Sequence, residues 1–223
     1  MKPKHIYLVR HGESEGNIDK SVYARKPDYA LRLTDKGIKD AQKAGEVLTG
    51  LLGHSSAAKL AVYLSPHFRT KETMRGAMSQ LEGQPWRTFE DPRLREQEWG
   101  HLRSEQESDA ICSERDSYGT FYYRIPGGES GADVYDRMGA LIDTMHRDFE
   151  RPDFPESAVI FGHGMGNRLF LMRWFHWTVE QFERAANPAN GEIFWMSLNE
   201  DGRYKIMIGP KDNGGPAHRW TFE

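Results

Sequence analysis

The chain contains very little cysteine. Cys112 is the only cysteine among 223 residues, so no disulfide can form within the chain, and this composition is typical of a reducing compartment. No run approaches the roughly 20 consecutive apolar residues of a membrane span. Residues 1–10 also contain no long apolar segment of the kind found in secretory signals. These absences predict a cytoplasmic protein without a membrane span.

No single sign of charge dominates the chain. The 30 Lys and Arg residues and 33 Asp and Glu residues give a formal net charge of -3. This balance argues against a general nucleic-acid or polybasic membrane binder, although a local basic pocket is compatible with it. The sequence has no internal repeat, and its length suits one hydrophobic core. We therefore predict a single domain over residues 1–223 with no nucleic-acid partner.

Short apolar runs alternate with segments of helical periodicity. Residues 6–9, 60–64 and 158–161 predict buried strands, and 192–198 and 204–208 predict a closing pair. Helices are expected over 35–52, from Ser65-Pro66 onward, over 132–149, from His163 to near Trp177, and from a capping box at Thr178 and Gln181. This alternation predicts an α/β fold, a three-layer α/β/α sandwich around a mostly parallel central sheet.

Two segments do not fit this pattern. Residues 100–130 mix charged and aromatic side chains without clean periodicity, and we interpret them as an insertion over the edge of the sheet that forms a pocket wall. The tail from Gly209 is rich in Gly, Pro and Lys, and we expect it to be loosely ordered.

Polar residues follow three of the predicted strands. Arg10 and His11 come after the first, Arg69 lies shortly after the second, and His163 follows the late strand. Because the carboxyl ends of parallel strands meet at one edge of a sheet, two histidines and two arginines should converge there. A neutral imidazole can attack phosphorus, and guanidinium groups can bind the phosphoryl oxygens. The leaving alkoxide would need a proton from a nearby carboxylic acid.

The motifs around these residues resemble those of the histidine phosphatase (phosphoglycerate mutase-like) superfamily. The resemblance covers about Lys4 to Leu198. It is carried by Arg10-His11-Gly12-Glu13, Asn17, Ser65-Pro66 with Arg69-Thr70 and Thr73, Leu94 to Gly100, Pro126 to Ser130, and Gly162-His163-Gly164. The segment Arg168 to Glu183, with Asn187 and Asn190-Gly191-Glu192, is similar to a smaller branch whose members are labelled phosphoglycerate mutase-like proteins or broad-range acid phosphatases.

The resemblance implies a role for each matching residue. His11 would be the phosphorylated nucleophile, and Glu96 would protonate the leaving group and later activate water. The predicted phosphoryl- and substrate-binding residues are Arg10, Asn17, Arg69 and His163, with Glu13 and Gly164 beside the two histidine motifs. The substrate is expected to be a small-molecule phosphomonoester. Neither a metal nor an organic cofactor is predicted, and the oligomeric state is not specified.

Several alternatives remain open from sequence. Glu98 and Glu13 compete with Glu96 for the acid role, and Glu129 is either a helix cap or a pocket residue. His67 and His101 could border the pocket. Arg25, Lys26, Arg103 and Tyr122-Tyr123-Arg124 are candidates for substrate selection.

Two rival functions use the same fold. A phosphoglycerate mutase would retain the phosphoryl group and return it to the substrate. Against it, this chain has Gly16-Asn17 where mutases carry Trp-Asn. The other rival is a non-catalytic binding protein, and the presence of every proposed catalytic residue disfavours it.

Overall fold

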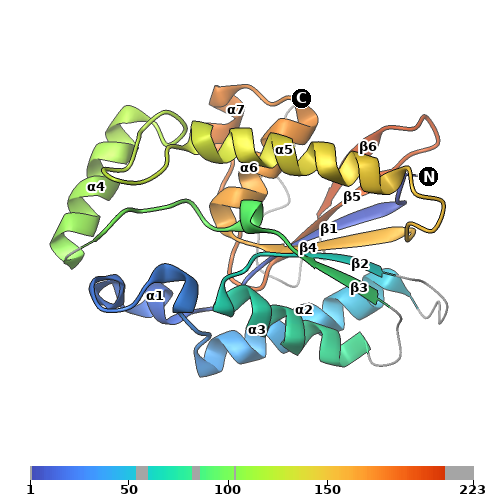
Figure 1. Cartoon of the computed structure of the whole chain (residues 1–223), viewed down its shortest axis with the longest axis horizontal. Helices are drawn as coiled ribbons and strands as arrows, with labels where there is room; N and C mark the ends of the chain where they lie inside the picture. The colour runs from blue at the N-terminus through green and yellow to red at the C-terminus, as the bar shows by residue number, and fades with distance from the viewer. Residues whose placement is uncertain (1, 54–59, 82–85, 103, 209–223) are drawn as a thin grey trace.

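A six-stranded sheet forms the centre of the molecule (Figure 1). The computed structural model describes residues 2–53, 60–81, 86–102 and 104–208. The strands lie in the order β3-β2-β4-β1-β5-β6. Their bounds are β1 His5–Arg10, β2 Leu60–Leu64, β3 Trp86–Glu90, β4 Ser157–Gly162, β5 Ile193–Leu198 and β6 Tyr204–Ile208. β3, β2, β4 and β1 are mutually parallel, and β5 and β6 each run antiparallel to the preceding strand in this order.

Helices cover both faces of the sheet, so the predicted α/β/α sandwich with a mostly parallel sheet is confirmed. α5 and α6 lie on one side, α2 and α3 on the other, and α1 and α4 lie beyond one end of the strands (Figure 1). The helices are α1 Glu15–Ile18, α2 Asp35–Leu52, α3 Phe68–Met78, α4 Glu105–Tyr118, α5 Gly131–Phe149, α6 Gly164–Phe175 and α7 Val179–Arg184. No helix in the described part of the chain is long and apolar enough to cross a bilayer.

Alternation along the central strand divides the core in two. Ile6 and Leu8 of β1 face a cluster formed with α5 and α6, whereas Tyr7 and Val9 face a second cluster formed with α2 and α3. Successive side chains of a strand point to opposite faces, so a strand covered on both faces is apolar throughout. This explains why residues 6–9 read as one continuous apolar run.

Two predicted helix ends are confirmed by their caps. α2 begins at Asp35, where the Thr34 hydroxyl accepts a hydrogen bond from the Gly37 N–H at 3.0 Å. α7 begins with the predicted reciprocal capping box between Thr178 and Gln181.

Three predictions of secondary structure were wrong or incomplete. α3 begins at Phe68, not at Ser65-Pro66, because the Ser65 hydroxyl bonds the imidazole of His163 instead of capping a helix. Strand β3 was not predicted, since its residues WRTFE lack a clear apolar run. The 100–130 segment contains α4, which buries only Ser108 and Ile111 and therefore has almost no apolar periodicity. The tail from Gly209 lies outside the described residues.

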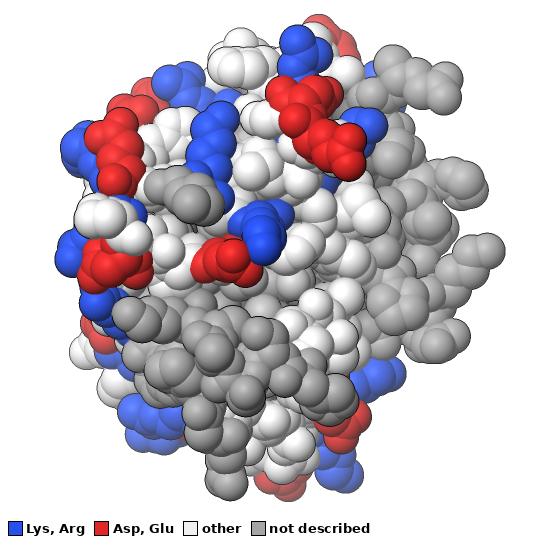
Figure 2. All heavy atoms as spheres, turned by 90° about the vertical axis from the view of Figure 1, so that its right-hand side faces the viewer, with Lys and Arg blue, Asp and Glu red and all other residues white. Residues whose placement is uncertain are grey.

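The face opposite α1 and α4 carries mixed charge. Figure 2 shows this face, on which the described Lys and Arg side chains alternate with Asp and Glu. Exposed ion pairs occur among the described residues, such as Arg87 with Asp153 at 2.8 Å.

Candidate active site

The site lies at the carboxyl edge of the parallel strands. β1 ends at Arg10 and leads directly to His11, while β4 ends at Gly162 and leads to His163. β5 runs antiparallel to β1 with Val9 opposite Ile193, so the segment before β5, which contains Asn187, reaches the same edge. The topology thus gathers residues from distant parts of the chain, as predicted for ligand sites of parallel sheets.

His11 is held in one orientation by a backbone contact. Its side chain is buried, and Nδ1 lies 2.7 Å from the carbonyl oxygen of Gly12. A carbonyl can only accept, so Nδ1 carries the proton and Nε2 keeps its lone pair. Burial, together with the charges of Arg69 and Arg10, holds the pKa of His11 well below its usual value. The imidazole is therefore neutral and nucleophilic at Nε2.

His163 lies against His11. The two ring centroids are 5.2 Å apart with an interplanar angle of 61°. Nε2 of His163 is 2.8 Å from the Ser65 hydroxyl, whereas its buried Nδ1 has no hydrogen-bond partner in the described protein. Burial and the charge of Arg69 hold its pKa well below the usual value. The neutral ring can thus offer an N–H donor at Nδ1.

Two arginines flank the histidines. Arg10 donates from Nη1 to the Pro188 carbonyl oxygen, and its buried Nε has no partner among the described residues. Arg69 is 3% exposed and pairs with the carboxylate of Asp28 through Nη1–Oδ1 and Nη2–Oδ2 contacts of 2.7 and 3.1 Å. Sequence analysis did not identify Asp28, because an aspartate after a proline is most simply a turn residue.

Glu96 places a carboxyl group beside His163. Its Oε2 is 4.0 Å from Nδ1 of His163. Burial raises its pKa above the usual value, against the hydrogen bond from the Gln97 N–H and the charge of Arg69. A carboxyl group with a raised pKa stays protonated to higher pH, which suits it to donate a proton.

Arg137 and Glu129 hold the loop that carries Glu96 in place. Arg137 donates to the carbonyl oxygens of Arg93, Arg95 and Glu96. Glu129 accepts from Arg137 and also pairs with Arg95. Glu129 is neither a helix cap nor a pocket residue. Ser130 caps α5, and the Glu129 carboxylate pairs with Arg137 and Arg95.

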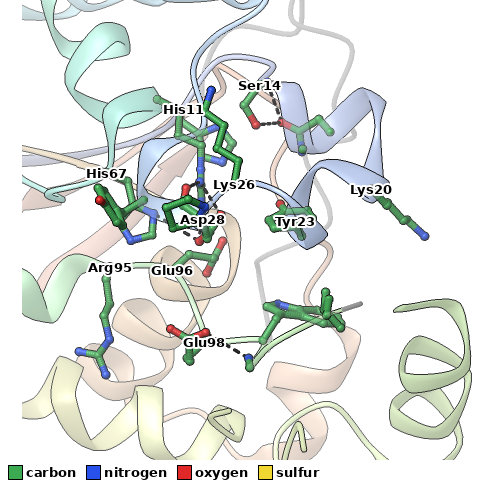
Figure 3. A pocket seen from close by; sticks show the side chains of 18 of the residues that line it. His11, Ser14, Lys20, Tyr23, Lys26, Asp28, His67, Arg95, Glu96 and Glu98 are labelled. Carbon is green, nitrogen blue, oxygen red and sulfur yellow. Dashed lines mark hydrogen bonds and ion pairs between the residues drawn. The ribbon is translucent and has the colours of Figure 1, made fainter. Parts of the chain in front are cut away.

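A third imidazole, that of His67, completes the histidine cluster. Its ring centroid is 4.8 Å from that of His163, and its buried Nδ1 has no hydrogen-bond partner among the described residues. Burial and the charge of Arg69 lower the pKa of His67 to about 4, so it is neutral at pH 7. Figure 3 shows His67, His11, Asp28 and Glu96 gathered at one end of the pocket.

A cavity of about 870 Å³ opens over this cluster. Beyond the histidines, its wall comes from the segment around η1 (Lys20–Ala24), the loop after Glu96, and α4. The wall residues include Tyr23, Lys26, Trp99, Leu102, Ser108 and Cys112. The predicted wall from the 100–130 segment therefore does face the cavity. Lys20, at its rim, points away from the histidine cluster (Figure 3).

The remaining predicted binding residues do not all line the cavity. Asn17 lines the cavity, but its Oδ1 accepts hydrogen bonds from Ser14. The Glu13 side chain does not line the cavity, since it is turned toward Thr34 and Lys36 at the start of α2. Gly164 is not a wall residue either.

Gly164 instead gives Asn187 room to reach the cavity. A Cβ at position 164 would lie 2.2 Å from Oδ1 of Asn187, and Asn187 does line the cavity. Sequence analysis named Asn187 only as part of the branch resemblance.

His67 and His101, which could border the pocket according to the sequence, do line the cavity. Among the candidates for substrate selection, Lys26 also lines it. Arg25 does not, and it pairs with Asp19. Tyr122-Tyr123-Arg124 are not among the cavity residues, and Arg103 lies outside the described residues. Within the described ranges, no group of three or more His, Cys, Asp or Glu side chains is arranged to hold a metal ion.

Comparison with known proteins gives the same family as the motifs. The chain is 39% identical over 218 residues to the phosphoglycerate mutase-like protein AT74 of Arabidopsis thaliana, covering 93% of this chain and 69% of that protein. It is 28% identical over 298 residues to the broad-range acid phosphatase DET1 of Saccharomyces cerevisiae, covering 92% of this chain and 89% of that protein.

Solved structures show the same fold. A mycobacterial glucosyl-3-phosphoglycerate phosphatase in complex with inorganic phosphate matches with a TM-score of 0.69 and 20% identity, covering 92% of this chain and 96% of that chain. A family model described as histidine phosphatase superfamily (branch 1) matches residues 6–208. The chain therefore belongs to branch 1 of the histidine phosphatase superfamily, whose members related to it include phosphatases.

Proposed function

We propose that this protein is a metal-independent phosphomonoester hydrolase that acts through a phosphohistidine at His11. The observation that carries the proposal is the fixed tautomer of His11, whose Nδ1 is tied to the Gly12 carbonyl oxygen at 2.7 Å. This contact leaves the Nε2 lone pair available for attack on phosphorus. The site also offers donors for phosphoryl oxygens, namely Nε of Arg10, Nδ1 of His163 and the guanidinium of Arg69.

In the first step, the His11 Nε2 lone pair forms a bond to phosphorus. The bond between phosphorus and the ester oxygen breaks, and its electron pair leaves with that oxygen. Glu96 transfers its proton to the same oxygen, so the leaving group departs as an alcohol. The raised pKa of Glu96 keeps it protonated for this step.

In the second step, water attacks the phosphorus of the phosphohistidine. Glu96, now a carboxylate, removes a proton from the water, and the bond between phosphorus and Nε2 breaks with its electrons returning to His11. Inorganic phosphate is released and Glu96 is again protonated. Arg10 and Arg69 stabilise the negative charge on the phosphoryl oxygens in both steps.

The relatives leave two outcomes for the phosphohistidine. DET1 is named a broad-range acid phosphatase, and AT74 is named a phosphoglycerate mutase-like protein. We favour hydrolysis because the cavity, at about 870 Å³, is far larger than a phosphoryl group and extends as far as α4. A mutase, by contrast, must retain its phosphoryl group away from water.

The test combines kinetics with trapping of the intermediate. Wild-type protein is incubated with p-nitrophenyl phosphate in the presence of a chelator, then denatured and examined for acid-labile phosphohistidine. We expect turnover that the chelator does not change, and labelling only at His11. Normal turnover by the His11→Ala variant would contradict the nucleophile assignment.

A second arm separates the hydrolase from the mutase and tests the acid. Wild-type protein with 3-phosphoglycerate should release phosphate and form no 2-phosphoglycerate, whereas isomerisation without phosphate release would indicate a mutase. Glu96→Gln should slow turnover by about 100-fold or more. Glu98→Gln is the matched variant for the competing acid, and a larger loss there than at position 96 would reverse the assignment.

A further inference from the structure

We propose that Asp28 is a positioning residue that holds the guanidinium of Arg69 so that its Nε–Nη2 edge is presented to the phosphoryl group. The inference rests on the proposed function to the extent that a phosphoryl group must bind at Arg69. It assigns a role to a residue in the segment between α1 and α2. None of the histidine phosphatase motifs described above includes this residue.

The hydrogen bonds show which edge of Arg69 is used. Nη1 donates to the backbone oxygen of Asp28 at 2.9 Å and to its Oδ1 at 2.7 Å, and Nη2 donates to its Oδ2 at 3.1 Å. A guanidinium group has five N–H donors. Asp28 therefore takes both hydrogens of Nη1 and one of Nη2.

The two remaining donors form a second fork. They are the Nε–H and the other hydrogen of Nη2, and neither has an acceptor among the residues that the structure describes. Two parallel N–H groups match two oxygens of a phosphoryl group. Because Arg69 is 3% exposed and lines the cavity, this fork has little access to bulk solvent. The Asp28 contact therefore leaves free the edge that bidentate phosphoryl binding requires.

Asp28 is itself fixed relative to the helix that carries Arg69. It opens the short 3-10 helix η2 (Asp28–Ala30), and Pro27 precedes it with φ at -65°. The ring of Tyr29 packs edge-on against Phe68 in α3, with centroids 6.1 Å apart. Arg32 pairs with Glu72 of α3 at 2.6 Å. The carboxylate is thus anchored to the same helix as the guanidinium.

A competing interpretation makes Asp28 a blocker. A carboxylate on Arg69 could occupy the place of the phosphoryl group, and Asp28 would then weaken phosphate binding. The geometry argues against this. The Asp28 carboxylate contacts the Nη1–Nη2 end of the guanidinium, and the Asp28 backbone oxygen also accepts a hydrogen bond from Nη1. The two interpretations predict opposite changes in phosphate affinity when the carboxylate is removed.

The decisive measurement is the affinity for inorganic phosphate, determined by isothermal titration calorimetry on the full chain. In Asp28→Asn, the amide nitrogen cannot accept a hydrogen from Arg69 and the negative charge is removed, so a single side-chain acceptor remains to hold the guanidinium. We expect phosphate to bind about 10-fold more weakly. Unchanged or tighter binding would overturn the proposal, and tighter binding would identify Asp28 as a blocker.

A double-mutant cycle tests whether Asp28 acts through Arg69. Lysine has no second fork, so in the Arg69→Lys background the Asp28→Asn change should alter phosphate affinity less than twofold. An equal effect in both backgrounds would show that Asp28 acts elsewhere. Asp153→Asn is the control, because it removes another ion-paired carboxylate, which contacts Arg87 at 2.8 Å, and neither of these two residues lines the cavity. It should leave phosphate affinity unchanged.

A measurement on wild-type protein removes any dependence on the folding of the variants. In ¹⁵N-labelled protein, phosphate should shift the Nε–H resonance of Arg69, identified by its absence in Arg69→Lys. A resonance that does not respond at saturating phosphate would refute the proposed use of that edge. Phosphate binding does not require a phosphohistidine, so these results stand whether or not His11 trapping succeeds.

Discussion

Burial shifts the pKa in opposite directions for the two residues that we propose as nucleophile and proton donor. It lowers the pKa of His11 and raises the pKa of Glu96, because the low-dielectric site disfavours the charged form of each. Both shifts favour the combination of an unprotonated His11 with a protonated Glu96 at acidic pH. One physical cause thus favours the protonation state that the proposed mechanism requires of each group.

The first prediction concerns this pH range. As pH rises through the raised pKa of Glu96, the proton donor is lost and kcat/KM falls. As pH falls through the lowered pKa of His11, the nucleophile is lost. We expect a bell-shaped profile with its optimum below pH 7, measured with ethyl phosphate, because its alkoxide leaving group needs the proton.

Glu96→Gln provides the control for this profile. Its residual turnover should lose the alkaline limb, because glutamine does not titrate. A limb that persists unchanged in the variant would belong to the substrate phosphate or to another group, and the assignment to Glu96 would then be wrong.

The second prediction is that the effect of Glu96→Gln depends on the leaving group. An alkyl alkoxide is strongly basic and needs a proton, whereas p-nitrophenolate leaves without one. The variant should lose at least about 10-fold more activity toward an alkyl phosphate than toward p-nitrophenyl phosphate. With p-nitrophenyl phosphate it should accumulate phosphohistidine, detected after rapid quenching, because the second step lacks its base. Equal losses for both substrates would contradict this role.

At the scale of elements, the backbone that follows β1 packs directly against the backbone at the start of α2. A Cβ on Gly12 would lie 2.3 Å from the Gly37 carbonyl oxygen, and a Cβ on Gly37 would lie 1.9 Å from the Glu13 carbonyl oxygen. The loop that carries His11 therefore rests directly on the first turn of α2. Only residues without a side chain permit this approach.

The third prediction follows from this contact. Gly37→Ala should lower the free energy of unfolding by about 1–3 kcal/mol and reduce kcat, because the His11 loop must shift. Gly50→Ala, in the same helix, has nothing within 4 Å of its new Cβ. It should raise the stability by about 0.4–1 kcal/mol with unchanged kcat. Denaturant unfolding measures both, and equal effects of the two substitutions would refute the packing argument.

α4 is the element that shapes the outer cavity. Ile111 of α4 forms a small cluster with Leu102 and Ile125, against which Tyr23 and Trp99 pack. Lys20 also pairs with Asp109 of α4 at 2.7 Å. These contacts join the two sides of the cavity wall, so the shape of the outer cavity depends on the position of α4.

The fourth prediction tests this dependence. Ile111→Ala should reduce kcat/KM for benzyl phosphate several-fold more than for ethyl phosphate, since only the benzyl group fills the outer cavity, while the two alcohols have similar basicity. Ser113→Ala, at an exposed position of α4 that does not line the cavity, controls for a general loss of activity. A uniform loss for both substrates would show that α4 does not contact the leaving group.

At the scale of the whole molecule, one sheet supports two cores. Leu141 belongs to the cluster on the α5 side and Leu48 to the cluster on the α2 side, and both side chains are fully buried. Each core uses alternate residues of the same strands, so neither can lose its packing without exposing the sheet shared with the other. This arrangement supports the prediction that the chain is one domain.

The fifth prediction is a single cooperative transition. Leu48→Ala and Leu141→Ala should each lower the free energy of unfolding by about 2–5 kcal/mol, and each should shift the whole transition. Calorimetry should give equal calorimetric and van't Hoff enthalpies. Two separated transitions in either variant would show that the two faces unfold independently.

The sequence alone determined five of the six described strands, most helices and the family. Apolar runs such as 6–9 and 60–64 identify strands because burial on both faces requires continuous apolarity. The cap at Thr34 marked the start of α2 because its hydrogen bond is local. His11 and His163 were identifiable because they follow strands and carry recognisable motifs.

Only the tertiary structure decided the features that depend on contacts across the chain. Ser65 bonds His163, 98 residues away, so no local pattern could show that it does not cap α3. The direction of the Glu13 side chain, the pKa shifts of Glu96 and His163, and the clamp of Asp28 on Arg69 all arise from burial and from distant partners. Sequence determines which groups are present at an edge of the sheet, whereas their charge and orientation follow from what surrounds them in the folded protein.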